Sequence, residues 1–218
     1  MDITAELVKT LREKTGVGLM DCKEALKISN GDMDKAVDHL REKGLAKAQK
    51  RAGRAATEGT VAVYIHMGGK IATMVEINCE TDFVAKTDQF QTFAKDVAMQ
   101  VTAANPSYVK REDVPVEVRD KEKHIYRIQA KEADKPEKIL DKIADGKLEK
   151  FYQEVCLLEQ KFIMNGDLTV AQHLATKTAE IGEKLSIRRF TKYVLGEGLE
   201  KRKDDFAAEV AAQSAAAK

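Results

Sequence analysis

The sequence predicts an α+β fold, in which an N-terminal module of three short helices precedes a core of a small antiparallel sheet packed with helices. Two observations lead to this prediction. Apolar residues recur at helical spacing through the first fifty or so residues, and alternation with a period of two replaces that spacing from about residue 61. A third observation is an apolar stripe of helical period directly after the alternating runs, because such a helix can cover one face of a sheet.

Three short apolar stripes fill residues 1 to about 50. Thr4 can cap the first helix, and Gly16 and Gly18 interrupt the pattern after it. Asn30-Gly31-Asp32 is typical of a turn, with Asp32 as the N-cap of the third helix. The apolar positions are Leu7, Val8 and Leu11, then Leu19, Cys22 and Leu26, then Met33, Ala36, Val37 and Leu40. Helices this short must bury their stripes against one another.

A basic, alanine-rich segment follows the third stripe, with no acidic residue from Gly44 to Thr57. Its cations are Lys43, Lys47, Lys50, Arg51 and Arg54. One interpretation is a contact surface for RNA or for an acidic protein face. The other is a solvated helical linker between two domains, which is the more common origin of such a charge run.

The clearest strand prediction is an antiparallel hairpin around Gly68-Gly69. The β-branched and aliphatic residues at every second position are Val61, Val63, Ile65 and Met67 before the glycines, and Ile71, Thr73, Val75 and Ile77 after them. Two glycines between alternating runs predict a two-residue turn, because both can adopt positive φ without steric cost.

A helix is predicted from Asp88, directly after the hairpin. Its stripe consists of Phe90, Phe93, Ala94, Val97, Ala98 and Val101. All three prolines lie in the middle third of the chain, where they punctuate further helices. The last of these helices is predicted to end at Asn165-Gly166-Asp167. It carries Leu148, Phe151, Tyr152, Val155, Glu159 and Phe162.

Two further elements and a tail complete the predicted core. Thr169 to about Ile181 has the pattern of a helix. Leu185 to Leu195 is rich in β-branched and aromatic residues, so it predicts a third strand. The alanine-rich segment from Asp204 predicts a terminal helix.

Composition excludes several classes of protein. Lys and Arg number 37 against 36 Asp and Glu, and this formal net charge of +1 argues against binding to nucleic acid or membrane mainly by bulk charge. The three cysteines, Cys22, Cys79 and Cys156, are too few and too widely spaced for a disulfide framework or a CxxC pair. No stretch resembles a secretory signal or a transmembrane helix. We therefore expect a cytoplasmic protein with no membrane partner.

Motifs of enzymatic chemistry are missing from the sequence. It contains no phosphate loop, no GxGxxG, no GxSxG and no HExxH. The four histidines are isolated, and Cys22 and Cys156 fall on or beside apolar stripes, where cysteine behaves as a small hydrophobic residue. We therefore predict no catalytic residue, no metal site and no cofactor. The enzymatic hypothesis left open is a nucleophilic Cys79 acting with a distant histidine.

The segment from Asn78 to Asp88 connects the hairpin to the phenylalanine-rich helix and carries an unusual apolar pair. Phe83 and Val84 come directly after Asp82, in a connection where polar residues are expected. One interpretation is structural: Asp82 caps a helical turn from Phe83 to Lys86, and Phe83 staples that turn onto the core. The other is that Phe83 projects as a probe for a pocket on another protein.

Three motifs resemble signatures of the translation elongation factor Ts family. The first is INCETDFVAKTDQF, from Ile77 to Phe90. The second is LREKTGVGLMDCKEAL, from Leu11 to Leu26, which matches the family pattern LRxxTGxGxMDCKxAL. The third, less specific, is GEGLEK followed by DDFAAEVAAQ near the C-terminus. The resemblance covers nearly the whole chain and favours the probe interpretation of Phe83.

The resemblance implies a guanine-nucleotide exchange factor that binds elongation factor Tu-GDP, displaces magnesium and promotes GDP release so that GTP can bind. It assigns partner binding and magnesium dislocation to Thr81, Asp82, Phe83 and Val84. It also suggests partner contacts by Arg12, Met20 and Lys23, although Met20 could equally be a core residue and the two cations could be solvated.

The resemblance also implies a domain organisation. Residues 1–54 would form a GTPase-contacting module similar to ubiquitin-associated domains, residues 55–198 the α+β core and dimerisation domain, and residues 199–218 a C-terminal helical tail. Longer members of the family contain two related core halves and a helical hairpin insertion, whereas this sequence shows one β-hairpin, its helices and one later strand. This points to the short form, in which two chains pair and two factors bind two GTPases.

Two alternatives from other classes accompany this expectation. The first is an RNA-binding module that uses residues 43–54, which lacks the interleaved aromatic residues expected of single-strand readers. Direct binding of nucleic acid is therefore not expected. The second is the enzyme with Cys79 as its nucleophile.

Overall fold

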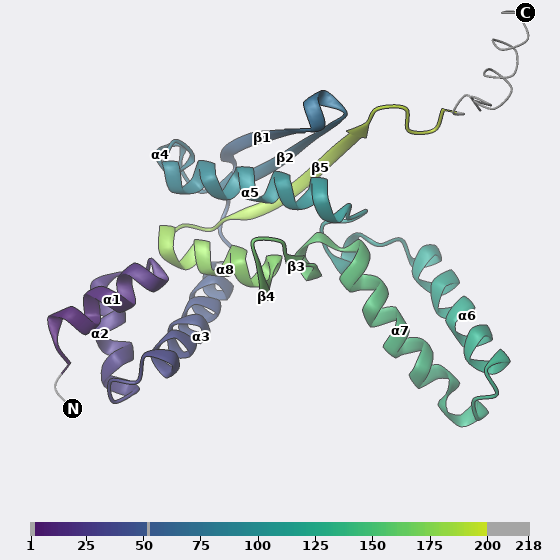
Figure 1. Ribbon diagram of the computed structural model, residues 1–218, viewed down its shortest axis with the longest axis horizontal. Helices are drawn as coiled ribbons and strands as arrows, with labels where there is room; N and C mark the ends of the chain where they lie inside the picture. Colours follow the sequence, from purple (N-terminus) through teal and green to yellow (C-terminus); the bar gives the residue numbers. More distant parts are fainter. Residues whose placement is uncertain (1–2, 52, 200–218) are drawn as a thin grey trace, which may run out of the picture.

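The computed structural model describes residues 3–51 and 53–199, and it confirms the α+β fold (Figure 1). Three helices open the chain: α1 (Ala5–Thr15), α2 (Leu19–Ile28) and α3 (Met33–Arg51). They enclose an apolar core of their own, formed by Val8, Leu11, Cys22, Ala25, Leu26, Ala36 and Leu40. The predicted stripes therefore pack against one another.

Both predicted caps of the three-helix module are confirmed. The Thr4 hydroxyl accepts a hydrogen bond from the Leu7 N–H at 3.3 Å, and the Asp32 carboxylate accepts from the N–H groups of Asp34 and Lys35, each at 3.1 Å. The prediction that Leu19 is a core residue is wrong. Leu19 is the first residue of α2 and lies exposed, since the buried residues of that helix begin one turn later.

The central sheet has three antiparallel strands, β1 (Glu58–His66), β2 (Ile71–Cys79) and β5 (Ser186–Val194), in the order β1-β2-β5. The hairpin and the third strand are thus confirmed, but the two-residue turn is wrong. His66 pairs with Ile71, which leaves the four residues 67–70 in the connection. Met67 has a φ of 50° and belongs to this connection, not to β1.

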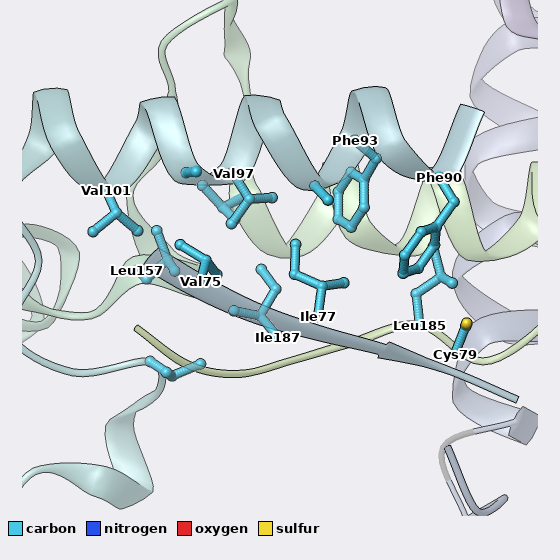
Figure 2. Close-up of a cluster of buried hydrophobic side chains, with 14 of the residues drawn as sticks. Val75, Ile77, Cys79, Phe90, Phe93, Val97, Val101, Leu157, Leu185 and Ile187 are labelled. Atoms are coloured by element: carbon cyan, nitrogen blue, oxygen red, sulfur yellow. The ribbon is translucent and has the colours of Figure 1, made fainter. Parts of the chain in front are cut away.

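One face of the sheet is covered by α5 (Asp88–Ala104), and the predicted apolar stripe of this helix is confirmed in full. Figure 2 shows Phe90, Phe93 and Val97 pointing from α5 toward β2. The side chains that meet them from the strands and their flanks are Val75, Ile77, Cys79, Leu185 and Ile187. This cluster is the main hydrophobic core.

In β1 the aliphatic residues of the alternating run face away from that core. Val61, Val63 and Ile65 are 53–63% exposed, whereas Ala62 and Tyr64 pack against the cluster under α5. The register explains the difference, because Ala62 and Tyr64 pair with the buried positions Val75 and Thr73 of β2. Alternation of period two predicts a strand without saying which of its two faces is buried.

The middle of the chain forms a helical hairpin that projects from the core (Figure 1). Its two arms are α6 (Val116–Glu132) and α7 (Leu140–Val155), joined through the short 3₁₀ turn η3 (Glu137–Ile139). The resemblance implied such a hairpin only for longer members of the family, and this expectation is wrong, because this chain has one. Another 3₁₀ turn, η2 (Arg111–Asp113), precedes it, and Arg111 ties the hairpin base together by ion pairs with Glu149 and Glu159.

The predicted end of the helix at Asn165-Gly166-Asp167 is wrong, because α7 stops at Val155. Beyond it the backbone N–H groups of Leu157 and Leu158 bond to the carbonyls of Tyr108 and Val109, at 2.9 and 3.0 Å. This pairing draws the chain out of the helix and into a 3₁₀ turn and two short strands. They are η4 (Leu157–Glu159), β3 (Lys161–Phe162) and β4 (Asn165–Thr169).

The last described helix, α8 (Val170–Ile181), confirms the prediction for that segment and has Thr169 as its N-cap. It lies between the core and α3, which packs along it (Figure 1). A short helix, α4 (Asp82–Ala85), and the 3₁₀ turn η1 (Met67–Gly69) complete the elements. The predicted helix from Asp204 lies outside the described residues.

Gly59 provides a test of the sheet register. Its φ is +144°, and a Cβ added there would lie 2.0 Å from the carbonyl oxygen of Ile77 on the central strand. We expect Gly59→Ala to lower the free energy of unfolding by about 3 kcal/mol, because backbone must move to admit the methyl group. Chemical denaturation measures this change.

The matched control is Gly146→Ala within α7. Apart from its chain neighbours and the backbone of its own helix, no heavy atom of the described residues lies within 4 Å of a Cβ added there. This substitution should stabilise the chain by about 0.5–1 kcal/mol through helix propensity. Equal effects of the two substitutions would contradict the register described here.

His173 predicts a pH dependence of stability. Its ring stacks on Phe162 with centroids 4.2 Å apart, and its Nε2 is buried without a hydrogen-bond partner in the described part of the chain. Burial, with a smaller contribution from Lys177, lowers its pKa to about 4. In the unfolded chain the His173 imidazole binds a proton near pH 6.5. The stability contributed by the neutral, buried imidazole is therefore complete above that pH and is lost as the pH falls toward 4.

We expect this loss to be about 2 kcal/mol between pH 6.5 and pH 4, allowing for partial solvent screening. Urea denaturation of the wild type and of His173→Phe over this range measures it. The variant, which has no titrating group at this position, should show a flatter profile. Parallel profiles would show that His173 does not titrate differently in the folded and unfolded chains.

Candidate functional site

The connection between β2 and α5 is built as a rigid turn. β2 ends at Cys79 and α4 begins at Asp82, so two residues separate them. Thr81 is the N-cap of α4, with a hydroxyl that accepts a hydrogen bond from the Val84 N–H at 3.4 Å. The prediction that Asp82 caps this turn is therefore wrong by one residue. Thr81 has the extended backbone that a cap requires, while Asp82 is already helical.

Phe83 projects from this turn into solvent. Its side chain is 80% exposed, so the interpretation that it staples the turn onto the core is wrong. The anchoring is done by its two successors, because Val84 packs against the main core and Ala85 is buried within it. A large apolar side chain held outward on an anchored turn fits the probe interpretation.

Asp82 gives the projecting turn a negative charge beside Phe83. Its carboxylate pairs with the Lys86 ammonium at 2.8 Å, one helical turn away. The hydrogen bond to Lys86 lowers the pKa of Asp82, which is ionised at neutral pH. The predicted motif residues therefore differ in role. Thr81 and Val84 hold the turn, and Asp82 and Phe83 form its outer surface.

The three residues singled out on the helical module are all at the surface. Met20 is 79% exposed, which excludes the alternative that it is a core residue, and Arg12 and Lys23 are exposed as well. Leu19 and Ile28 add further exposed apolar surface on α2. This is an unusual accumulation for a helix of ten residues and marks α2 as a candidate contact surface.

The helical module and α4 lie toward the same end of the molecule, at the left of Figure 1. The end of α8 connects them. The Gln89 side chain, at the start of α5, donates a hydrogen bond to the Glu180 carboxylate at 3.1 Å. A Cβ added to Gly16, at the end of α1, would lie 3.1 Å from the same carboxyl group. One partner could therefore touch α2 and Phe83 together.

Three cations of the basic segment at residues 43–54 bond to other parts of the chain. Lys43 pairs with Asp21 at 3.0 Å and also with Glu24. The Arg51 guanidinium donates to the carbonyl of Thr178 at 3.3 Å, where α3 packs on α8. Arg54 pairs with Glu80, which lies just before α4. These contacts favour the interpretation of a helical linker over a surface for RNA.

Cys79 does not have the environment of a nucleophile. Its thiol is buried and donates a hydrogen bond to the carbonyl of Thr81 at 3.1 Å. Burial, together with the nearby negative charge of Glu183, raises the pKa of Cys79 to about 11, so the thiolate is not populated at neutral pH. The structure therefore argues against the hypothesis of a Cys79 enzyme.

Neither a metal centre nor a membrane span is found in the described part of the chain. Within residues 3–51 and 53–199, no three side chains of His, Cys, Asp or Glu are grouped so that they could hold a metal ion. No helix described there is both long and apolar enough to cross a membrane.

A second candidate surface, which the sequence analysis missed, is the face of the sheet opposite α5. Three rows of paired residues cross it: Val61–Glu76–Arg189, Val63–Met74–Thr191 and Ile65–Ala72–Tyr193. The sequence holds no signal for this surface without the register, which pairs the odd-numbered residues of β1 with even-numbered residues of β2. We call this surface the open sheet face. Its exposed apolar area is typical of an interface.

Comparison with known proteins gives a consistent result over almost the whole chain. A family model described as Elongation factor TS matches residues 6–197. Elongation factor Ts from Carboxydothermus hydrogenoformans is 61% identical over 210 residues, which are 96% of this chain and 97% of the relative. Elongation factor Ts from Geobacter sulfurreducens is 59% identical over 212 residues, 97% and 98% of the two chains. Its counterpart from Geotalea daltonii is 59% identical over 216 residues, 99% and 100%.

Proposed function

The chain belongs to the elongation factor Ts family, and on that premise we propose that it is a guanine-nucleotide exchange factor of translation elongation. It binds elongation factor Tu carrying GDP, promotes release of the GDP, and leaves the GTPase free to bind GTP in the cytoplasm. No covalent bond changes in this process, so the chain acts as a binding protein and not as an enzyme. The observation that carries the proposal is the exposed Phe83 on its anchored turn, inside the family motif TDFV.

The mechanism follows from linkage between two ligands of the GTPase. GDP, magnesium and the phosphate-binding loop of the GTPase hold one another in place. A partner that binds a displaced arrangement of these elements weakens nucleotide binding, and nucleotide must weaken partner binding by the same factor. We assign the displacement to Thr81, Asp82, Phe83 and Val84, with Phe83 as the wedge and the ionised Asp82 beside it.

Phe83 cannot supply the whole effect. Complete burial of one phenylalanine contributes roughly 1.5–3 kcal/mol, which corresponds to about ten- to a hundredfold in affinity. Displacing a tightly held nucleotide requires more, so several contacts must act together. We propose that Arg12, Met20 and Lys23 supply a second contact, since they lie exposed at the same end of the molecule.

This division of labour defines the domains we propose. Residues 1–54 are the helical module that contacts the GTPase, and residues 55–198 are the core that carries α4 and the dimer interface. Residues 199–218 are a C-terminal tail, of which only Leu199 is described. The ion pair of Arg54 with Glu80 joins the linker of the first domain to the turn of the second.

We further propose that two copies of the chain pair through the open sheet face and bind two molecules of elongation factor Tu. Supporting this, the face carries a row of exposed apolar residues, while α5 covers the opposite face. A sheet with one uncovered apolar face gains most from a second layer packed against it. Val84 and Ala85 anchor α4 in the core on the other side of the sheet, so pairing through the open sheet face leaves Phe83 available to the GTPase.

The direct test is the release of a fluorescent GDP analogue from elongation factor Tu, followed by stopped-flow fluorescence in the presence of excess unlabelled GDP. Addition of the chain should accelerate release in a concentration-dependent and saturable way. Release that is as slow with the chain as without it would refute the proposed function.

A further inference from the structure

A carboxylate from a distant part of the sequence holds the backbone in front of α4. Glu183 comes directly after Gly182, the C-cap of α8, and is half-buried. One of its oxygens accepts hydrogen bonds from the N–H groups of Glu80 and Thr81, at 3.1 and 3.0 Å. The other accepts from the Thr81 hydroxyl at 2.7 Å. Three hydrogen bonds therefore connect one side chain to the two residues that precede the turn.

A further hydrogen bond connects the same two segments, and here the carboxylate belongs to the segment before α4. The Glu80 carboxylate accepts a hydrogen bond from the N–H of Lys184 at 2.7 Å, and this bond is the main reason that the pKa of Glu80 is lowered. The Lys184 ammonium in turn donates to the carbonyl of Arg54 at 2.6 Å. The chain before α4 is thus fixed to residues 183 and 184 through both backbone and side chains.

These bonds determine where Phe83 points. The Thr81 hydroxyl that donates to Glu183 is the one that accepts from Val84 and caps α4, so Glu183 fixes the cap in its working rotamer. A helix of four residues is not stable by itself. Since Phe83 is largely solvent-exposed, its direction is set by the backbone beneath it and not by packing of its own ring.

We propose that Glu183 is a positioning residue for nucleotide exchange, which acts on the partner only through α4 and Phe83. The inference rests on the proposed function. Its physical basis is preorganisation: a turn that is already ordered pays no entropy when the wedge enters the GTPase. Without Glu183 the same residues are present, but the turn must be ordered during the displacement itself.

Glu183→Ala is expected to lower the GDP-release rate at saturation by about tenfold. The concentration of the chain at half-saturation should change less than threefold, because the contacts of the helical module remain. Glu183→Gln retains a carbonyl oxygen for the two N–H groups, so it should recover the saturating rate to within threefold of wild type. Asp96→Ala removes a half-buried carboxylate from α5 and serves as the matched control, with a rate within twofold of wild type.

A double substitution separates this inference from the proposed function. If Glu183 acts through Phe83, Glu183→Ala should change the rate less than twofold in a Phe83→Ala background. A full tenfold loss in that background would overturn the positioning role of Glu183 and leave the proposed function standing. The same holds if the release rate depends on Phe83 but not on Glu183. If Phe83→Ala itself leaves release unchanged, the proposed wedge is wrong and the positioning role is wrong with it.

Amide hydrogen exchange provides a readout that does not involve the partner. In Glu183→Ala, the amides of Glu80 and Thr81 should exchange at least tenfold faster than in the wild type. The amides of Val75 and Ile77 in the central strand should be unchanged, which shows that the variant is folded. Unchanged protection at Glu80 and Thr81 would overturn the proposal.

Discussion

Phe83→Ala is expected to slow the GDP release that this chain promotes by about ten- to a hundredfold. Burying one phenylalanine contributes roughly 1.5–3 kcal/mol, and this free energy corresponds to a change of about ten- to a hundredfold in the release rate. This correspondence assumes that the ring is buried when the nucleotide leaves and not before, so that its loss falls on the displacement step. Stopped-flow release of fluorescent GDP from elongation factor Tu, measured up to saturation, gives the rate.

The substitution should not disturb the fold, because the Phe83 ring makes little contact within the chain and is 80% exposed. Thermal unfolding of the variant should therefore match that of the wild type. Met164→Ala is a suitable control, since it truncates another exposed apolar side chain, 63% exposed, in the connection between β3 and β4. Equal release rates for wild type and Phe83→Ala would show that the TDFV turn does not act as a wedge, even though the family membership stands.

The elements that the sequence predicted best are those whose periodicity matches their burial. The stripe of α5 is buried at every predicted position, and Thr73, Val75 and Ile77 of β2 are all buried. These elements lie at the centre of the fold, where each of them packs one face against the core, so the apolar periodicity coincides with the buried residues. Thr4, Asp32 and Thr169 act locally, so their caps were also visible or implied in the sequence.

The predictions failed where a distant segment decides the local structure. The apolar spacing continues beyond Val155 to Phe162, but the chain leaves the helix there because residues 157 and 158 pair with residues 108 and 109. No prediction was made of which face of β1 is buried, because that depends on its pairing with β2 and on the position of α5, neither of which is encoded in β1 alone. Periodicity reports a local preference, and tertiary pairing overrides it.

The candidate site shows the same division. The motif made Thr81, Asp82, Phe83 and Val84 identifiable in the sequence, yet residue types alone favoured a core role for Phe83. Glu183, which holds the turn from outside the motif, was not identifiable, because it lies 102 residues from Thr81 and belongs to no recognised motif. Only the folded chain brings them together. The residues that we propose to touch a partner are thus easier to find from sequence than the residue that positions them.

Val63→Glu should abolish pairing of the chain with itself. Val63 lies in the middle row of the open sheet face, beside Met74, and is 53% exposed, so the monomer can accept a charge there. In a symmetric pair the substitution places one carboxylate per chain in the interface. Burying each without a partner costs about 2 kcal/mol, so the dissociation constant should rise by about a thousandfold.

Sedimentation equilibrium at micromolar concentrations distinguishes the outcomes. The wild type should be a dimer and Val63→Glu a monomer, with Val116→Glu as a control at an exposed valine at the start of α6. A monomeric wild type would refute pairing, and a dimeric Val63→Glu would place the interface elsewhere. The effect is large because the two valines and the isoleucine of the open sheet face are exposed to water in the monomer, and pairing gains free energy by burying them. A charge at the centre of the face removes that gain.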